Sequence, residues 1–395
     1  MQDFIQAIDK HPVLRIDLTN ILNRSIIVKT VITLGDLQLE TPPAALTLHP
    51  HETRRLSLKV TSGKASPDNL YPLRIVMNAG QDGEAVHKED MRVNLISHRT
   101  ITIDGDLSDW RGVLPQTIRS DSAIGVSMSE KAYLPFAKFD EGTANGLAAG
   151  YLAYDENCFY FASRISDDTP DPGAPRFEFR DQDADFYPEV SYTDSSKKTP
   201  LIWPAGVRRF SYRQDPEIPC GKFANGGYRD NVQLAFNVIP PSGKSMLMNP
   251  PGTEPRFMSY PCTDYEFALN KVAEQYGGGT EIWRLLSPGM PRKNFYPRQP
   301  HAIIDGGPVK SGKLVVKRDG NMRIVECAIP WEEIPEVKKR LDNGQSIKFS
   351  FRVNDNGGPS SELASGRSAS KDDPLAFHVD WATHWATELE FGFER

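Results

Sequence analysis

The stretch Ile101-Thr-Ile-Asp-Gly-Asp-Leu-Ser-Asp-Trp110 is the most informative part of this chain for predicting its fold. Its two isoleucines alternate with polar residues as in a strand. Asp104 and Gly105 favour a tight turn, because glycine accepts positive φ and aspartate hydrogen-bonds its own backbone. A second short turn follows and ends on Trp110. The stretch lies where one β-rich segment stops and a larger one begins, so it predicts a domain boundary after residue 97.

The bulk composition is that of an ordinary globular chain. Its 395 residues are 39% hydrophobic and 25% charged, which is enough apolar material for more than one core. The net charge is −6 and no long lysine or arginine run is present, which argues against a nucleic-acid partner. No apolar stretch approaches the roughly 20 residues that a membrane-spanning helix needs. We therefore expect two or three globular domains without a membrane span.

Residues 13–97 alternate apolar and polar residues in short runs, the last of them at residues 91–96. Turns separate these runs about every 8–12 residues, which is the spacing of an all-β sandwich. About seven such strands fit into the segment, as in immunoglobulin domains. We therefore predict an immunoglobulin-like β-sandwich at residues 1–97, and we find no catalytic set of residues in its sequence.

Residues 98–395 form the larger predicted unit, which is also all-β. Alternating runs predict strands at residues 151–154, 159–165, 231–238, 313–317, 322–329, 347–353 and 389–393. Between about 170 and 310 the periodicity loosens, and we expect an irregular insertion on the sandwich there. Within it, a capping box at Thr263, an apolar stripe from Tyr265 to Tyr276 and a glycine run at 277–279 predict a short helix.

Four segments in a fixed order resemble the β-sandwich of family 9 carbohydrate-binding modules and of the wider DOMON-like group. They lie at residues 101–110, 150–168, 325–334 and 349–358. The likeness covers residues 100–168 and 312–393, with a longer middle part than the family pattern needs. It implies a DOMON-like sandwich at residues 98–395 that binds sugars without catalysing a reaction. It also implies an extracellular or periplasmic location and, as in many such modules, structural calcium.

The resemblance points to aromatic residues that would hold a sugar. Modules of this kind clamp a pyranose between two rings, one of them near the C-terminus, and Trp381 and Trp385 stand there in this chain. Trp203 is the first candidate for the second ring, followed by Trp283, for which a core position is the alternative. The apolar face of a pyranose suits a flat indole, and polar side chains satisfy its hydroxyl groups.

Polar candidates lie in two regions of the chain. Asn354 and Asp355 follow a predicted strand and offer oxygen atoms to sugar hydroxyls or to calcium, with a solvated turn as the alternative. Arg284 and Arg298 lie in a stretch rich in turn residues, where guanidinium groups suit an acidic or sulfated glycan. A loop pinned by internal salt bridges explains the same stretch without a ligand.

Metal and cofactor candidates are few. Asp167 and Asp168 end a predicted strand and, with Asp355, are the residues that we expect to bind calcium. The scattered methionines and histidines show no axial-ligand pattern for haem, which some DOMON-like relatives bind. We therefore expect no organic cofactor.

The four cysteines form no CxxC pair, which argues against a zinc or redox motif. Cys158 and Cys327 lie in apolar strand patterns and are expected in the core. Cys220 and Cys262 lie in the irregular middle, and the sequence leaves a disulfide between them open.

An enzymatic function is the first alternative to sugar binding alone. A glycoside hydrolase needs two carboxylates roughly 5–10 Å apart, and Asp264, Glu266 and Glu281 are available. A polysaccharide lyase needs a base, for which Tyr296 and His301 are available. Sequence spacing does not decide whether any of these groups meet in the fold.

The sequence therefore predicts non-catalytic carbohydrate binding, as the C-terminal accessory region of a secreted polysaccharide-degrading enzyme. The expected partner is a polysaccharide or oligosaccharide, with no nucleic acid and no membrane span, and the chain is expected to act as a monomer or as part of a larger protein. The alternatives are that the insertion makes the sandwich a glycoside hydrolase or polysaccharide lyase, or that the chain is a structural or interaction module without a sugar site.

Overall fold

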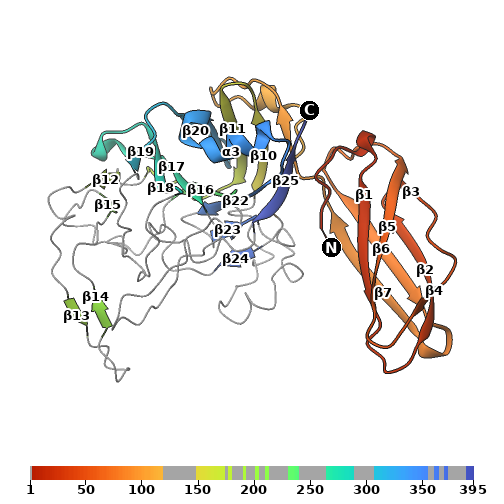
Figure 1. Ribbon diagram of the computed structural model, residues 1–395. Helices are drawn as coiled ribbons and strands as arrows, with labels where there is room; N and C mark the ends of the chain where they lie inside the picture. The colour runs from red at the N-terminus through yellow and green to blue at the C-terminus, as the bar shows by residue number, and fades with distance from the viewer. Residues whose placement is uncertain are drawn as a thin grey trace.

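The protein is described here by a computed structural model, which covers residues 2–118, 148–173, 177–179, 190–192, 201–203, 210–212, 230–239, 264–288, 307–354, 360–363, 369–371 and 388–395. This part of the chain is all-β, as predicted, and α3 (Pro335–Asp342) is the single α-helix in it (Figure 1). None of the helices within these ranges is long and apolar enough to span a membrane.

The N-terminal residues form two antiparallel sheets. The first has the order β1 (Val13–Thr19), β5 (Thr53–Ser62), β3 (Gln38–Leu39), and the second has the order β4 (Leu46–Leu48), β2 (Ile26–Leu34), β6 (Tyr71–Asn78), β7 (Glu84–Met91). Short 3-10 turns lie at η1 (Ile8–Lys10) and η2 (Gly80–Asp82). Alternate residues of both sheets, such as Leu14, Val60 and Leu73, share one apolar core. Seven strands in two sheets agree with the predicted strand count, and the immunoglobulin-like assignment stays a prediction.

The larger sheet folds over on itself to enclose the main core. One half has the order β19 (Gly307–Pro308), β18 (Thr280–Leu286), β17 (Tyr265–Lys271), β16 (Asn231–Asn237), β22 (Ile347–Asn354), β25 (Leu389–Phe393). The other half continues with β8 (Leu95–His98), β10 (Ala148–Tyr154), β11 (Cys158–Ser166), β21 (Met322–Pro330), β20 (Lys313–Asp319). Short strands flank it at β9 (Gln116–Thr117), β23 (Ser360–Glu362) and β24 (Ala369–Lys371).

Aromatic side chains fill the space between the two halves. The ring of Phe159 on β11 lies 5.1 Å from Phe236 on β16 and 5.8 Å from Phe349 on β22, measured between centroids. Gly150 lets the layers approach closely at this level, because a Cβ there would lie 2.6 Å from the ring of Phe351. The far edges also meet: the Thr280 hydroxyl donates a 2.9 Å hydrogen bond to the carbonyl of Leu314. The result is a closed, flattened sandwich.

Strand β8 joins the two halves of this sheet. It pairs in parallel with both β10 and β25, so it lies between them. The sequence predicted a strand at residues 91–96 as the last of the N-terminal series. The structure instead ends β7 at Met91 and begins β8 at Leu95. Hydrogen bonds of the larger sheet therefore involve residues on both sides of the boundary predicted after residue 97, and the division into two domains stays a prediction.

The predicted helix starting at Thr263 is wrong. Residues 265–271 form β17, and the 3-10 turn η6 (Glu274–Tyr276) leads into β18. Tyr265 and Leu269 are four residues apart, which fits a helix face and also a strand face of period two. Phe267 lies between them and is fully buried in the same core, so pairing with β16 and β18 decides for the strand. The predicted insertion thus supplies β16, β17 and β18 to the main sheet.

A buried carboxylate anchors the entry turn of the larger unit. Glu326 on β21 has no exposed surface, and one of its oxygens accepts hydrogen bonds from the backbone N–H groups of Asp104 (2.9 Å) and Gly105 (2.7 Å). Its other oxygen accepts a 2.7 Å bond from the Trp110 indole, at the end of the 3-10 turn η3 (Leu107–Trp110). Gly105 has φ +81°, and a Cβ there would meet the Lys317 side chain at 2.8 Å. The Asp-Gly turn is therefore fixed both by its hydrogen bonds to Glu326 and by the lack of space for a side chain at position 105.

We expect Glu326→Gln to lower the free energy of unfolding by about 2–4 kcal/mol, because an amide NH₂ replaces one of the two accepting oxygens. Urea denaturation followed by tryptophan fluorescence measures the change. Trp110→Phe is the matched control: it removes one donor and keeps the carboxylate, so the loss should be about 1–2 kcal/mol. An unchanged unfolding midpoint for Glu326→Gln would show that this carboxylate does not anchor the turn.

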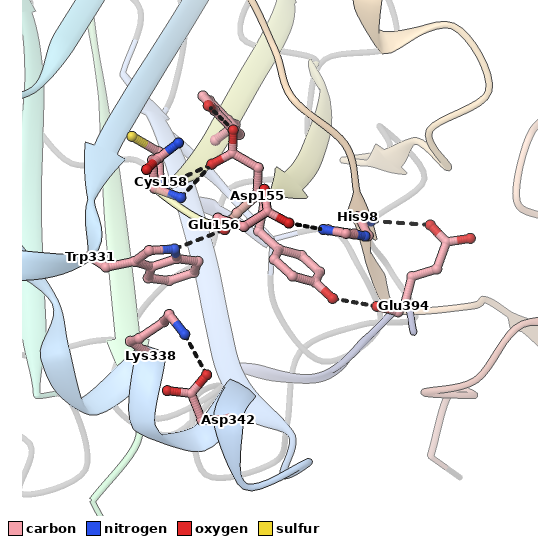
Figure 2. A network of polar contacts seen from close by, with 11 residues as sticks. His98, Asp155, Glu156, Cys158, Trp331, Lys338, Asp342 and Glu394 are labelled. Carbon is pink, nitrogen blue, oxygen red and sulfur yellow. Dashed lines mark hydrogen bonds and ion pairs between the residues drawn. The ribbon is translucent and has the colours of Figure 1, made fainter.

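The β10–β11 hairpin, which the sequence predicted, is held by a second buried carboxylate (Figure 2). One oxygen of Asp155 accepts from the backbone N–H groups of Asn157 (2.7 Å) and Cys158 (2.9 Å). The other accepts a 2.8 Å bond from the Tyr160 hydroxyl, and the Asp155 carbonyl accepts a 2.9 Å bond from the Trp331 indole. Burial acts to raise the pKa of Asp155, but these hydrogen bonds outweigh it and hold the pKa below its ordinary value.

Polar contacts also tie β8 to this hairpin and to the C-terminal strand (Figure 2). The His98 ring lies 3.2 Å from the Glu156 carboxylate, and its backbone N–H donates a 3.2 Å hydrogen bond to the Glu394 carboxylate. The Tyr154 hydroxyl donates to the Glu394 carbonyl. These bonds join the same three segments that the parallel pairing of β8 brings together.

We expect the destabilisation caused by Asp155→Asn to depend on pH. A carboxyl whose folded-state pKa is lowered contributes stability above its unfolded-state pKa, and that contribution is lost as the pH falls through the folded-state pKa. The difference in unfolding free energy between wild type and variant should therefore be greatest near neutral pH and shrink below about pH 4. Urea titrations across this range measure it, and a difference that grows on acidification would contradict the expected sign.

Candidate functional site

Polar side chains gather on the face of one half-sheet that points away from the apolar core. On β16, Val232, Leu234 and Phe236 belong to the core, so Asn231 and Gln233 point to the opposite side. The neighbouring strands alternate in the same way. We call this side of β18, β17, β16 and β22 the outer polar face, formed by Asn231, Gln233, Glu266, Asn270, Glu281, Trp283, Ser350 and Arg352.

Strand register brings four of its positions into one line. Gln233 stands opposite Ala268 on β17 and opposite Arg352 on β22, while Ala268 stands opposite Trp283 on β18. We call this line, Trp283–Ala268–Gln233–Arg352, the central row. Neighbouring strands are about 4.8 Å apart, so the row spans about 14 Å. Ala268 places a small side chain between an indole on one side and an amide and a guanidinium on the other.

The positions beside the central row are also polar. Asn231, Asn270 and Glu281 stand opposite one another, and the Asn270 amide donates a 2.8 Å hydrogen bond to the Glu281 carboxylate. On the other side Ser350 stands opposite Ala235, and its hydroxyl donates a 2.6 Å bond to the Leu363 carbonyl. The row is therefore flanked by amide, carboxylate and hydroxyl groups.

Most of these side chains are buried. Gln233, Glu266, Asn270 and Arg352 are each no more than 2% exposed, and Trp283 is 3% exposed. Burying polar groups costs free energy unless they are hydrogen-bonded, whereas an apolar outer face would avoid the cost. Gln233, Glu266, Asn270, Arg352 and Trp283 each take part in further contacts, as buried polar groups normally do.

A pocket adjoins the outer polar face at the β18–β19 edge. It has a volume of about 410 Å³, and its wall includes Glu281, Trp283, Pro308, Lys310 and Leu314. Ligand pockets are commonly about 300–1,000 Å³, so this one is large enough for a small saccharide unit. Two of its wall residues, Glu281 and Trp283, also belong to the outer polar face.

Several predicted site residues lie outside the described ranges, namely Trp381, Trp385, Arg298 and Asp355. Trp203 ends β14 (Leu201–Trp203), which pairs with β13 (Val190–Tyr192); a second short pair is β12 (Phe177–Phe179) with β15 (Phe210–Tyr212). The Trp203 side chain is outside the described part. Asn354 ends β22 opposite Asn231, so its register position adjoins the outer polar face.

Two predicted ligand residues are engaged in ion pairs. The guanidinium of Arg284 pairs with Glu333 in the turn η7 (Trp331–Glu333) and lies 6.0 Å from the centre of the Phe267 ring. It therefore stands apart from the outer polar face. Asp167 is fully buried, and its carboxylate accepts a 2.9 Å hydrogen bond from Arg318. Asp168, the next residue, is exposed.

Two of the three carboxylates proposed for glycoside hydrolysis, Glu266 and Glu281, are too far apart to form a catalytic pair. The carboxylate of Asp264 accepts hydrogen bonds from the backbone N–H groups of Val238 (2.7 Å) and Ile239 (2.8 Å), which makes it part of the chain turn. Glu281 stands opposite Asn270, four residues along β17 from Glu266. Strand geometry puts these two glutamates about 13 Å apart along the sheet, beyond the roughly 5–10 Å that the chemistry needs.

Other reactive groups of the described chain are held in their protonated forms. Burial and the neighbouring Glu336 carboxylate raise the pKa of Tyr265, so its phenol is not a base at neutral pH. Burial also raises the pKa of the Cys158 and Cys327 thiols, which are both free. Cys327 is fully buried, as expected for a core residue, whereas Cys158 is only partly buried. Cys220 and Cys262, and the lyase candidates Tyr296 and His301, lie outside the described ranges.

Within the described ranges, no three histidine, cysteine, aspartate or glutamate side chains cluster closely enough to hold a metal ion. The calcium prediction at Asp355 falls on a residue that those ranges omit.

Gln233 and Arg352 were not among the residues predicted from the sequence, and Glu266 was considered only as a carboxylate for hydrolysis. Each is a polar residue at an alternating position of a strand whose other positions are apolar. That alternation was read only as the sign of a half-buried strand. The signal that could have found them is the repetition of large hydrogen-bonding side chains on the same phase of three strands, although their register is not readable from the sequence.

Comparisons with known proteins give a distant likeness. No protein-family model matches the chain, and no curated protein sequence matches it. Two solved structures of a family 9 carbohydrate-binding module from Caldicellulosiruptor kristjanssonii are similar over 76% of this chain. For the module in complex with cellotriose, the similarity extends over 93% of that module, with 12% sequence identity and a TM-score of 0.34. For the module in complex with glucose, the similarity extends over 94% of that module, with 12% sequence identity and a TM-score of 0.33.

Proposed function

We propose that the outer polar face binds a saccharide without catalysing a reaction. The observation that carries the proposal is the central row, which places Trp283, Gln233 and Arg352 on adjacent strands with Ala268 between the indole and the polar groups. No other surface of the described chain combines an indole with guanidinium, amide and carboxylate side chains in one strand register.

The chemistry of the row fits a pyranose. The C–H face of the sugar packs on an indole, and its hydroxyl groups both donate and accept hydrogen bonds. Arg352 supplies donors only, Glu281 in its ionised form supplies acceptors only, and Gln233 supplies both. The small side chain of Ala268 separates the indole from the two polar groups. These groups therefore bind a neutral sugar by complementing its hydroxyls.

The 410 Å³ pocket is the point of access in this proposal. Trp283 and Glu281 line it and also belong to the outer polar face, so a sugar unit seated there contacts both. Lys310 also lines this pocket and adds a donor.

We infer further that the chain serves as an accessory region of a secreted polysaccharide-degrading protein. Two features support this: the outer polar face has the chemistry of a binding surface, and Glu266 and Glu281 are too far apart for hydrolysis. The polysaccharide partner, the extracellular or periplasmic location and the immunoglobulin-like neighbour belong to the same proposal.

We expect the protein to bind at least one member of a polysaccharide and cello-oligosaccharide panel, and Trp283→Leu to weaken that binding at least about tenfold through loss of the stacking ring. Isothermal titration calorimetry measures the affinity. Trp331→Phe is the matched control, because Trp331 is a buried tryptophan in the β10–β11 turn network, away from the outer polar face. Equal loss in both variants would mean that stability, and not stacking, was changed.

A second series tests the aromatic residues predicted near the C-terminus. We expect Trp381→Ala or Trp385→Ala to weaken binding to the same ligand if either ring completes the clamp. Binding that survives both variants but is lost in Trp283→Leu would place the whole site on the outer polar face. Reducing-sugar release from the panel would favour the hydrolase alternative, and the absence of any binding would favour a structural module.

A further inference from the structure

A cluster of buried charges closes one end of the sandwich. Arg323, on β21, is 4% exposed, and its Nη1 lies 3.2 Å from a carboxylate oxygen of Asp230, the residue before β16. Its Nε lies 3.5 Å from the carboxylate of Asp167, just beyond β11. Arg318 Nη1 donates a 2.9 Å hydrogen bond to the same Asp167 oxygen. Two arginines of the β20–β21 hairpin therefore hold the ends of strands from both halves of the sheet.

Backbone hydrogen bonds extend the cluster into the chain that follows β11. The N–H of Asp171 donates a 3.1 Å bond to the Asp230 carboxylate, and the N–H of Gly173 donates a 2.6 Å bond to the Asp171 carboxylate. Asp171 and Asp230 are each 8% exposed. A cavity of about 80 Å³ lies among Asp171, Asp230, Arg318 and Arg323. The start of β16 is thus fixed against the β20–β21 hairpin by charge.

This arrangement does not fit the calcium that the family resemblance implies for Asp167. Calcium is bound by six to eight oxygen ligands at roughly 2.3–2.6 Å. Here guanidinium nitrogens lie 2.9 and 3.5 Å from the Asp167 carboxylate and already neutralise it. A divalent cation placed on the same oxygens would be repelled by both guanidinium groups.

We propose that Arg323, assisted by Arg318, is a built-in cation that replaces a structural metal ion at this end of the sandwich. Its guanidinium supplies the positive charge that two buried carboxylates need, and Arg318 adds a directed hydrogen bond to Asp167. Folding of this end is consequently independent of calcium. The proposal is separate from saccharide binding, because it concerns only how β11, β16 and the β20–β21 hairpin are held together.

Thermal unfolding of the full chain in millimolar calcium and in excess EDTA tests the proposal. We expect Arg323→Met to lower the Tm by about 10 °C in EDTA, because it leaves Asp167 and Asp230 without their shared cation. Calcium should then raise the Tm of this variant by several degrees, since the Asp230 carboxylate has lost its cation and can recruit another. Arg164→Met is the matched control: Arg164 is exposed on β11, and neither its Tm nor its calcium response should change.

Two further variants keep the test decisive. If Arg323→Met does not fold, the double variant Arg323→Met with Asp230→Asn should recover folding in part, because it removes an unpaired charge together with its partner. An unchanged Tm in Arg323→Met would overturn the proposal. So would a calcium-induced rise in the wild-type Tm that Asp167→Asn abolishes, because it would place a metal ion at this end.

Discussion

The larger sandwich depends on one buried carboxylate. Glu326 accepts three hydrogen bonds from a single stretch of chain, two from backbone N–H groups at the Asp-Gly turn and one from the Trp110 indole. A charge with no exposure to water is stable only when its acceptor sites are filled. The three hydrogen bonds of Glu326 therefore form only when the turn lies at one place along β21. Strand β8 immediately precedes the turn and lies between β10 and β25, so the same anchor helps to fix where the two halves of the sheet join.

Local patterns predicted local structure well. The hairpins over residues 155–157 and 319–322 formed as expected, because turn residues there separate two alternating runs. The pattern after Thr263 failed, since Tyr265 and Leu269 satisfy a period of four and a period of two equally. Only pairing with strands on both sides separates the two possibilities. The failure therefore arises from a missing long-range contact and not from an unusual local sequence.

The site was less predictable than the fold for the same reason. Gln233 and Arg352 are far apart in the chain and become neighbours only through the register of β16 with β22. A slip of one residue in that register would move every side chain of a strand to the opposite face. Candidates could therefore be ranked from the sequence only by residue type, which favoured tryptophans and carboxylates in predicted loops. Arg284, chosen in this way, pairs with Glu333 away from the outer polar face.

Strand β16 links the charge cluster to the outer polar face. Asp230 belongs to the cluster, and the next residue, Asn231, is the first polar residue of the face. Well-packed apolar residues in place of a buried ion cluster are often as stable or more stable, so stability alone is a weak reason for Arg323 to be there. The ion pair of Arg323 with Asp230, together with the hydrogen bond from the Asp171 N–H to the same carboxylate, holds the start of β16 in one position along its axis. The outer polar face has polar groups in register across four strands, so it depends on β16 being fixed along its axis.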